Sequence, residues 1–342
     1  MTNAPGIVFD WDSFARTYTG QTLSSGSEMI EHIERHDFMY TKAAMKSIYK
    51  LSQDKNFLRK MNNFITFRIL FHWMRHLSYE YNHLYRSYFT FLDGTKEFPD
   101  DWEKCLDLMA FDMPKALSAL YVSQFYKSDR DESVRTMTNY IQKTLTAEIE
   151  QYTWMDEKTK IAGREKLANL VYKVGKPDTW VDNTAIAAEM ARHYQGVSLS
   201  TTDHVANVKK LVPIRISEDR RKLNNELNPT DDWKLEMYDT HVEYNARWNE
   251  VIIPAGLIQE PLFAPGYPAY MNFGGLGTWI GIASVRAIGE TGQVLDSNNN
   301  VVNWWTQKTW DNYDALKQTM IDFYNYTTPI GIVISFSNNF QI

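Results

Sequence analysis

The chain has 342 residues, enough for a large core and for two domains. Hydrophobic residues make up 44% of it and charged residues 23%, which is typical of a folded globular protein and excludes wholesale disorder. The net charge of −6, with basic residues scattered along the chain, argues against nucleic-acid binding, and no run of about 18 apolar residues is present that would span a membrane.

Apolar residues at helical spacing predict helices in most of the first two thirds of the chain. We expect these helices over residues 28–50 with Ser27 as N-cap, 54–70 continuing through Tyr85, 102–126 with a new start at Pro114, 132–173 divided at 151–156, and 185–194. Residues 96–101, which contain Pro99, predict a break. Thr153 or Asp156 is expected to cap the helix that starts at Glu157. Residues 211–216 are predicted as a strand or an extended linker.

After Trp233 the pattern changes to short segments rich in β-branched residues. Residues 240–244 and 251–253 are predicted strands, and Pro254-Ala255-Gly256 forms a turn after the second. A glycine-rich entry at 274–277 leads into an apolar segment, and we expect this strand and helix to frame a cleft. Residues 304–326 predict another helix, whereas 329–342 have no clear helical face. The change of pattern places a domain boundary near Pro229.

Two histidine pairs have the i, i+4 spacing with which a helix presents two imidazoles to one zinc ion, namely His32/His36 and His72/His76. In neither pair does a glutamate follow the first histidine, so the H-E-x-x-H arrangement with its general base is missing. The first pair is interpreted as a solvated helix face. The second, with Glu80 and His83 further along, is interpreted as structural packing among aromatic residues, with a metal face as the alternative.

Two further residues need a chemical interpretation. His241 stands alone on a predicted strand and is interpreted as a structural histidine, with catalysis as the alternative. Cys105 is the chain's one cysteine, so no internal disulfide forms, and a buried, inert thiol is expected. No nucleophile elbow, phosphate loop or dinucleotide fingerprint is present.

Several segments, taken together and in order, resemble the neprilysin and endothelin-converting-enzyme family of zinc endopeptidases. The matching residues are Trp102, Cys105, Ala116, Leu117, Leu120, Tyr121, Val122, Phe125, Thr153-Trp154-Met155-Asp156, Thr159, Ala162, Lys166, Gly175-Lys176-Pro177-Asp178, Pro254-Ala255-Gly256-Leu257-Ile258-Gln259, Asn272-Phe273-Gly274-Gly275-Leu276-Gly277, Ile280-Gly281 and Trp304-Trp305. The resemblance implies a mainly α protein, with a large helical lobe followed by a partial zincin-like α+β catalytic domain that has a small sheet.

The resemblance also implies where the zinc site should be, directly after Ile280-Gly281. The H-E-x-x-H positions there read Ile282-Ala283-Ser284-Val285-Arg286, so both ligand positions (Ile282, Arg286) and the base position (Ala283) are lost. The family's downstream aspartate and arginine positions appear as Gly289 and Gln293, and its third ligand is expected beyond Ile342. Arginine offers a metal no lone pair, and its charge about 4 Å from a dication is repelled by roughly 8 kcal/mol at an effective dielectric of ~20. No cofactor is therefore predicted for this chain, although zinc is the family's cofactor.

We expect a helical lobe over 1–229, a partial catalytic domain over 230–328 and a divergent tail over 329–342. The expected function is that of a catalytically inactive relative that binds peptides, or an active family member, through a residual cleft at His241, Val242, Asn245 and Ala255. The alternatives are a truncated or miscalled product of a gene for an active membrane or secreted zinc endopeptidase, and an unstable fragment. The resemblance implies an extracellular or plasma-membrane location, which the chain's missing signal peptide and membrane span leave open.

Overall fold

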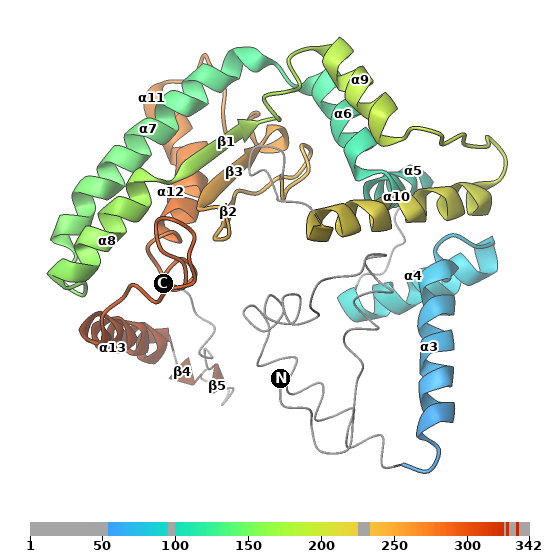
Figure 1. Cartoon of the computed structure of the whole chain (residues 1–342), viewed down its shortest axis with the longest axis horizontal. Helices are drawn as coiled ribbons and strands as arrows, with labels where there is room; N and C mark the ends of the chain where they lie inside the picture. Colours follow the sequence, from blue (N-terminus) through green and yellow to red (C-terminus); the bar gives the residue numbers. More distant parts are fainter. Residues whose placement is uncertain (1–53, 95–99, 225–232, 325, 328–332, 335–342) are drawn as a thin grey trace. The chain divides into compact units, whose positions relative to one another are not determined.

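A computed structural model describes residues 54–94, 100–224, 233–324, 326–327 and 333–334. The chain forms two compact units, one from Met1–Asp112 with Gly196–Leu227 and one from Met113–Gln195 with Asn228–Ile342. The elements of each are labelled in Figure 1. The predicted helix over 28–50 and the boundary near Pro229 lie outside the described residues. The three predicted domain ranges therefore remain predictions.

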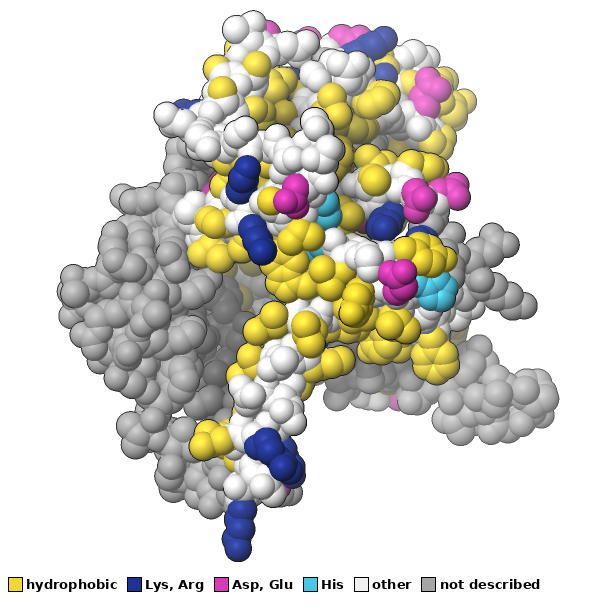
Figure 2. Space-filling view, turned by 90° about the vertical axis from the view of Figure 1, so that its right-hand side faces the viewer, with side chains coloured by type: hydrophobic (Ala, Val, Ile, Leu, Met, Phe, Trp, Pro, Cys, Tyr) yellow, Lys and Arg dark blue, Asp and Glu magenta, His cyan; other side chains and the backbone are white. Residues whose placement is uncertain are grey.

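The first unit is built from helices α3 (Phe57–Met74), α4 (Tyr79–Asp93), α5 (Asp101–Asp112) and α10 (His204–Asn224). α3 contacts α4, and α5 contacts α10. The predicted helix from Asp54 breaks after Met74 and restarts at Tyr79, with Ser78 before the new start. Hydrophobic side chains on α3 and α4 are largely exposed, among them Phe64, Phe67 and Phe91 (Figure 2).

The prediction for residues 211–216 was wrong, because they lie inside α10 with Pro213 in the middle. Apolar β-branched residues suggested an extended segment. Lys209 and Lys210 before the segment and Arg215 within it favour a helix, and packing against α5 supports it. Tertiary contacts therefore outweigh the local preference.

The second unit contains most of the helices that the sequence predicts. Its α-helices are α6 (Pro114–Phe125), α7 (Asp131–Glu148), α8 (Glu157–Ala168), α9 (Asn183–His193), α12 (Thr278–Val285) and α13 (Gln307–Tyr324), together with the short α11 (Ala269–Asn272), which was not predicted. Pro114 stands at the start of α6, where its missing N–H is not needed. The carboxylate of Asp156 accepts from the backbone N–H of Thr159 at 2.9 Å, which confirms Asp156 as the N-cap of α8.

A three-stranded sheet lies at the centre of the second unit. Its strands are β1 (Val171–Gly175), β2 (Glu243–Asn245) and β3 (Glu250–Pro254), in the order β1-β3-β2. β1 runs parallel to β3, with Val171 opposite Glu250, and β2 runs antiparallel to β3, with Tyr244 opposite Val251. A separate antiparallel pair joins β4 (Tyr326–Thr327) and β5 (Val333–Ile334). Both strands predicted after Trp233 are present, although the first begins at Glu243, three residues later than predicted.

β1 corrects the prediction that helix continues to Lys173, because α8 ends at Ala168 and the chain then enters the sheet. The segment Val171-Tyr172-Lys173-Val174 contains two β-branched residues and a tyrosine, which suit a pleated surface. Gly175 ends the strand at a φ of 76°, a backbone region that glycine adopts without strain. The helical spacing of the preceding residues led to the prediction of helix through this short strand.

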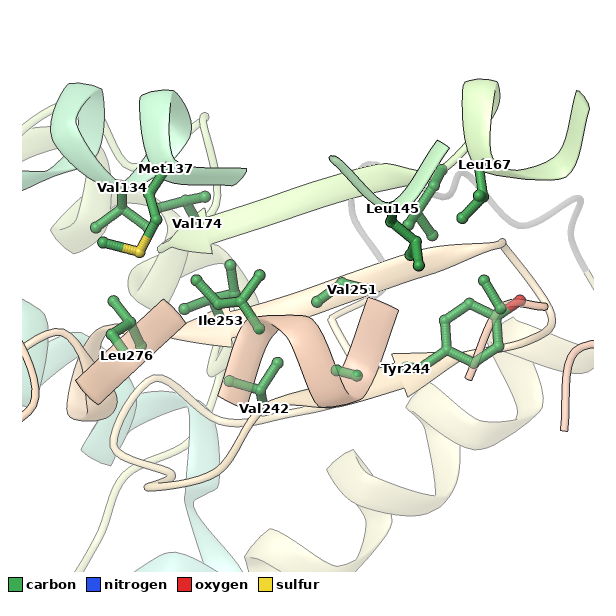
Figure 3. Packing of buried hydrophobic residues seen from close by; sticks show 14 of the residues in the cluster. Val134, Met137, Leu145, Leu167, Val174, Val242, Tyr244, Val251, Ile253 and Leu276 are labelled. Carbon is green, nitrogen blue, oxygen red and sulfur yellow. The ribbon is translucent and has the colours of Figure 1, made fainter. Parts of the chain in front are cut away.

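The main hydrophobic core fills the space between the sheet and helices α7 and α12 (Figure 3). Val134 and Met137 of α7 pack with Val174, Ile253 and Leu276, while Leu145 and Leu167 pack near Val251. Burying an aliphatic side chain of this size contributes about 1.5–3 kcal/mol. A smaller cluster joins α6 to α9 through Val122, Trp180 and Ile186. The protein is therefore mainly helical with a small sheet, as the sequence predicts, and none of its described helices is long and apolar enough to cross a membrane.

Candidate functional site

The helix that carries the expected motif positions, α12, follows a glycine-rich turn. Residues Phe273–Gly277 form a π-helical turn, and the backbone N–H of Leu276 donates to the carbonyl of Leu262 at 3.1 Å. A Cβ at Gly275 would lie 2.4 Å from that same carbonyl oxygen. Only glycine allows this close approach, so the glycine run sets how deeply α12 enters the core.

α12 turns one face to the core and the other outward. Ile280 and Ala283 belong to the main core, and Ser284 is buried with its hydroxyl near Tyr172 Oη at 3.0 Å. Burial raises the pKa of Tyr172, which keeps its hydroxyl protonated. Ile282 is 51% exposed, and Arg286 follows one turn later on the same exposed face. The core thus fixes α12 on one face, and the residues at the expected ligand positions lie on its exposed face.

These side chains do not fit a zinc ion. Ile282 and Ala283 carry only hydrocarbon, and Arg286 is a cation without a lone pair for a metal. Because Arg286 is exposed, its guanidinium can turn towards water, which weakens its repulsion of a metal ion. The main reason why zinc does not fit these positions is therefore the lack of donor atoms. Across the part of the chain that the structure describes, no group of three His, Cys, Asp or Glu residues is arranged to hold a metal.

The second part of the expected site lies at the strand next to α12. β2 is at one edge of the sheet, and residues 246–249 connect it to β3 in a hairpin. Asn249 has a φ of 49°, a conformation that asparagine tolerates, and its amide donates to the carbonyl of Lys166 at 2.8 Å. Tyr244 Oη donates to Asn249 Oδ1 at 3.0 Å. The hairpin is held rigidly from inside the fold.

The four residues of the expected peptide-binding cleft have different surroundings. His241 is exposed just before β2, whereas Val242 is in the main core and Ala255 is in the smaller cluster. Asn245 is buried, and its amide donates to Glu250 Oε1 at 2.9 Å while its carbonyl accepts from the Arg247 backbone at 3.2 Å. Three of the four thus support the strand from within, and His241 alone of them faces solvent.

A buried ion pair stabilises the sheet beneath these residues. Lys173 Nζ of β1 lies 2.9 Å from Glu250 Oε2 of β3, with side chains 9% and 1% exposed. The Lys173 ammonium also lies 5.8 Å from the ring of Trp233. This pair was not predicted from the sequence. Lys173 and Glu250 each lie in a segment rich in β-branched residues, and a charged residue in such a segment indicates a buried partner. Paired charges inside a sheet are retained only where each has a partner.

Another buried lysine anchors the segment that follows α12. Lys166 of α8 donates to the carbonyl of Leu295 at 2.5 Å, and burial lowers its pKa to about 8. Trp304 and Trp305 continue this support, since the Trp305 ring lies 5.2 Å from that of Trp154 and 5.0 Å from that of Tyr313. The resemblance marked both tryptophans, and the structure gives them a packing role.

The remaining candidate residues lie elsewhere. His72 and His76 are in the first unit, among Trp73 and Phe111, in keeping with structural packing. His32 and His36 lie outside the described residues. The expectation for Cys105 was wrong, because its thiol is exposed on α5. Helical periodicity alone did not show which face of α5 is covered.

Comparisons with known proteins match both parts of the chain to one family. Residues 2–177 match the profile of the N-terminal part of "Peptidase family M13", and residues 243–339 match the profile of its second part. Neprilysin-11 of Caenorhabditis elegans is 26% identical over 274 residues, covering 79% of this chain and 31% of the relative. Neprilysin of Oryctolagus cuniculus is 24% identical over 318 residues, covering 92% of this chain and 41% of the relative.

Solved structures agree at the level of the fold. A zinc metalloprotease of Mycobacterium tuberculosis, solved with an inhibitor, aligns at a TM-score of 0.68 with 24% identity, covering 77% of this chain and 38% of that one. PepO from Lactobacillus rhamnosis aligns at 0.67 with 21% identity, covering 78% and 40%. The chain therefore spans well under half of the length of these relatives.

Proposed function

The chain belongs to peptidase family M13, and we propose that it is a member without zinc chemistry that binds peptides along the edge strand β2. The exposed face of α12 carries the proposal. At the positions where the family resemblance expects two zinc ligands and a general base, the chain has Ile282, Arg286 and Ala283. None of these side chains can bind zinc or take a proton from water, so none of these three positions can supply the step that would activate water.

Peptide binding is supported by the geometry of the sheet. β2 is an edge strand, and an edge strand offers backbone N–H and C=O groups to an extended peptide, which can add to the sheet as a further strand. The exposed His241 stands at the start of this strand, where it can contact a bound peptide. The side chain of Glu243 within β2 pairs with Lys234, so charged groups border the same edge.

A rigid strand binds a peptide with less loss of conformational entropy than a mobile one. Val242 and Tyr244 anchor β2 in the core, and Asn245 ties it to Glu250 at 2.9 Å. These contacts preorganise the strand without any metal. The proposal therefore assigns structural support to Val242, Asn245 and Ala255 and ligand contact to the β2 backbone and His241.

The inactivity is tested on the purified chain by measuring zinc content and the cleavage of a short peptide together. We expect no stoichiometric zinc and no cleavage that a chelator inhibits. The variant I282H/R286H is the positive control, because it places two imidazoles at i, i+4 spacing on an exposed helix face and should take up zinc. Stoichiometric zinc with chelator-sensitive cleavage by the unmodified chain would overturn the proposal in favour of an active zinc endopeptidase.

Peptide binding has a separate test. A fluorescein-labelled peptide of alternating hydrophobic and polar residues is titrated with the chain and followed by anisotropy. The same peptide with N-methylated backbone amides is the control, since it cannot donate hydrogen bonds to a strand edge. We expect the unmodified peptide to bind at least tenfold more tightly. Equal binding of both peptides, or none of either, refutes pairing with β2.

A further inference from the structure

A buried histidine, His76, meets an exposed one, His204, where three helices of the first unit begin or end. His76 lies in the turn after α3, His204 is the first residue of α10, and Asp112 is the last residue of α5. His76 Nδ1 is 3.1 Å from His204 Nε2 and 3.9 Å from Asp112 Oδ2. The side chains of His76 and Asp112 are 0% and 8% exposed. The contact between His76 and His204 joins segments 128 residues apart in the chain.

The contact between the two rings needs one neutral acceptor nitrogen. His76 Nε2 is buried without a hydrogen-bond partner in the part of the chain that the structure describes. The favoured arrangement therefore has the proton of His76 on Nδ1, donating to the lone pair of His204 Nε2, because the opposite tautomer would bury an N–H without an acceptor. A second proton on His76 would create that buried N–H. A proton on His204 Nε2 would remove the acceptor.

The cationic groups around the pair oppose further protons, whereas the Asp112 carboxylate, 3.9 Å from His76 Nδ1, favours one there. From the α3 side, Arg75 donates to Tyr85 Oη of α4 at 2.6 Å and lies 4.8 Å from the ring of Phe111. From α10, Arg215 lies 4.5 Å from the same ring. His72 lies one turn before His76, with ring centroids 6.1 Å apart. Asp112 is the acidic group beside them, and burial raises its pKa.

We propose that the contact between His76 and His204 is an acid-sensitive latch, which holds the start of α10 against the end of α3 at neutral pH and releases it as the pH falls. Two neutral rings share one proton across the contact. Two protonated rings would face each other with N–H groups, near the guanidinium of Arg75.

The direction and size of the pH effect follow from the linkage between protonation and folding. Burial, then the neighbouring His204, Arg75 and His72, lower the pKa of His76 from 6.5 to about 4. For a group whose pKa is lower in the folded state, the closed form is favoured above pH 6.5 and loses its advantage as the pH falls towards 4. This shift predicts that the opening equilibrium rises roughly 20-fold between pH 7 and pH 5.

Hydrogen–deuterium exchange of the full chain tests the latch at pH 7 and pH 5, with exchange times scaled for the intrinsic rate. Segments 69–77 and 204–216 should lose protection by roughly 20-fold, whereas α7 in the second unit should change by less than about threefold. In the variant H76N/H204Q the amides imitate Nδ1 and Nε2 and do not titrate, so the loss should also fall below about threefold. H83N, at an exposed histidine of α4, is the matched control and should keep the loss of the unmodified chain.

An unchanged protection of both segments in the unmodified chain overturns the latch, and so does an equal loss in H76N/H204Q. If that variant does not fold at pH 7, an NMR titration of the histidine rings in the unmodified chain decides. A midpoint for His76 below about 5.5 supports the latch, and a midpoint at or above that value overturns it.

Discussion

Removing the charge of Glu250 should destabilise the second unit strongly, although it changes only one atom of the side chain. Glu250 is 1% exposed, its Oε2 lies 2.9 Å from Lys173 Nζ, and its Oε1 accepts from Asn245 at 2.9 Å. In E250Q the glutamine carbonyl can still accept from Asn245, but Lys173, 9% exposed, loses the carboxylate oxygen that lies 2.9 Å from its Nζ. Breaking a buried ion pair in this way costs about 3–5 kcal/mol.

The size of the effect can be converted into a melting temperature. For a unit of about 200 residues, 1 kcal/mol corresponds to about 2–4 °C, so E250Q should lower the Tm by roughly 6–20 °C. Differential scanning calorimetry and urea unfolding measure it. The double variant K173M/E250Q removes both charges and keeps the acceptor for Asn245, so its stability should return to within about 2 kcal/mol of the unmodified chain.

Two results would refute this reasoning. A loss below about 1 kcal/mol in E250Q would mean that solvent screens the pair as it screens surface pairs. A double variant as unstable as E250Q would mean that the loss does not come from breaking the ion pair between Lys173 and Glu250. If K173M/E250Q folds, it should also bind the extended peptide as the unmodified chain does, because β2 keeps its contacts with the core.

Two further variants test the support of α12 and α8. G275A should lower the free energy of unfolding in urea by about 1–3 kcal/mol, because the added Cβ would lie 2.4 Å from the carbonyl oxygen of Leu262. The control G274A places its Cβ where no atom lies within 4 Å, so it should be neutral or slightly stabilising. Equal costs of the two variants would refute the close approach at Gly275. D156A should cost about 1–2 kcal/mol, because Asp156 caps α8 and also accepts from the Thr306 hydroxyl at 2.5 Å, and D182A, which removes the similar cap of α9, should cost less. The hydrogen bond from Thr306 lowers the pKa of Asp156 below 3.8. The ionised carboxylate therefore stabilises the fold above that pH, and this stabilisation should fade as the pH drops further. A cost of D156A that is the same at pH 7 and pH 2 would contradict this pH dependence.

Where a structural signal is local, the sequence already carried it. Asp156 as a helix cap, Pro114 as a helix start and the strands around Tyr244 and Ile252 depend on neighbours within a few residues, and all are present in the structure. The missing zinc donors at Ile282 and Arg286 are likewise a matter of residue type, which no fold can change. The sequence by itself therefore determined the fold class, the family resemblance and the chemistry that α12 cannot perform.

Tertiary structure decided the features that depend on distant partners. β1 exists because Val171–Gly175 pairs with Glu250–Pro254, a strand far along the chain, and local helical spacing could not reveal that pairing. The same reason hid the Lys173–Glu250 pair and the contact between His76 and His204. It also explains why Cys105 is exposed, Asn245 is tied to Glu250 and residues 211–216 are helical, since each outcome depends on which face a distant element covers.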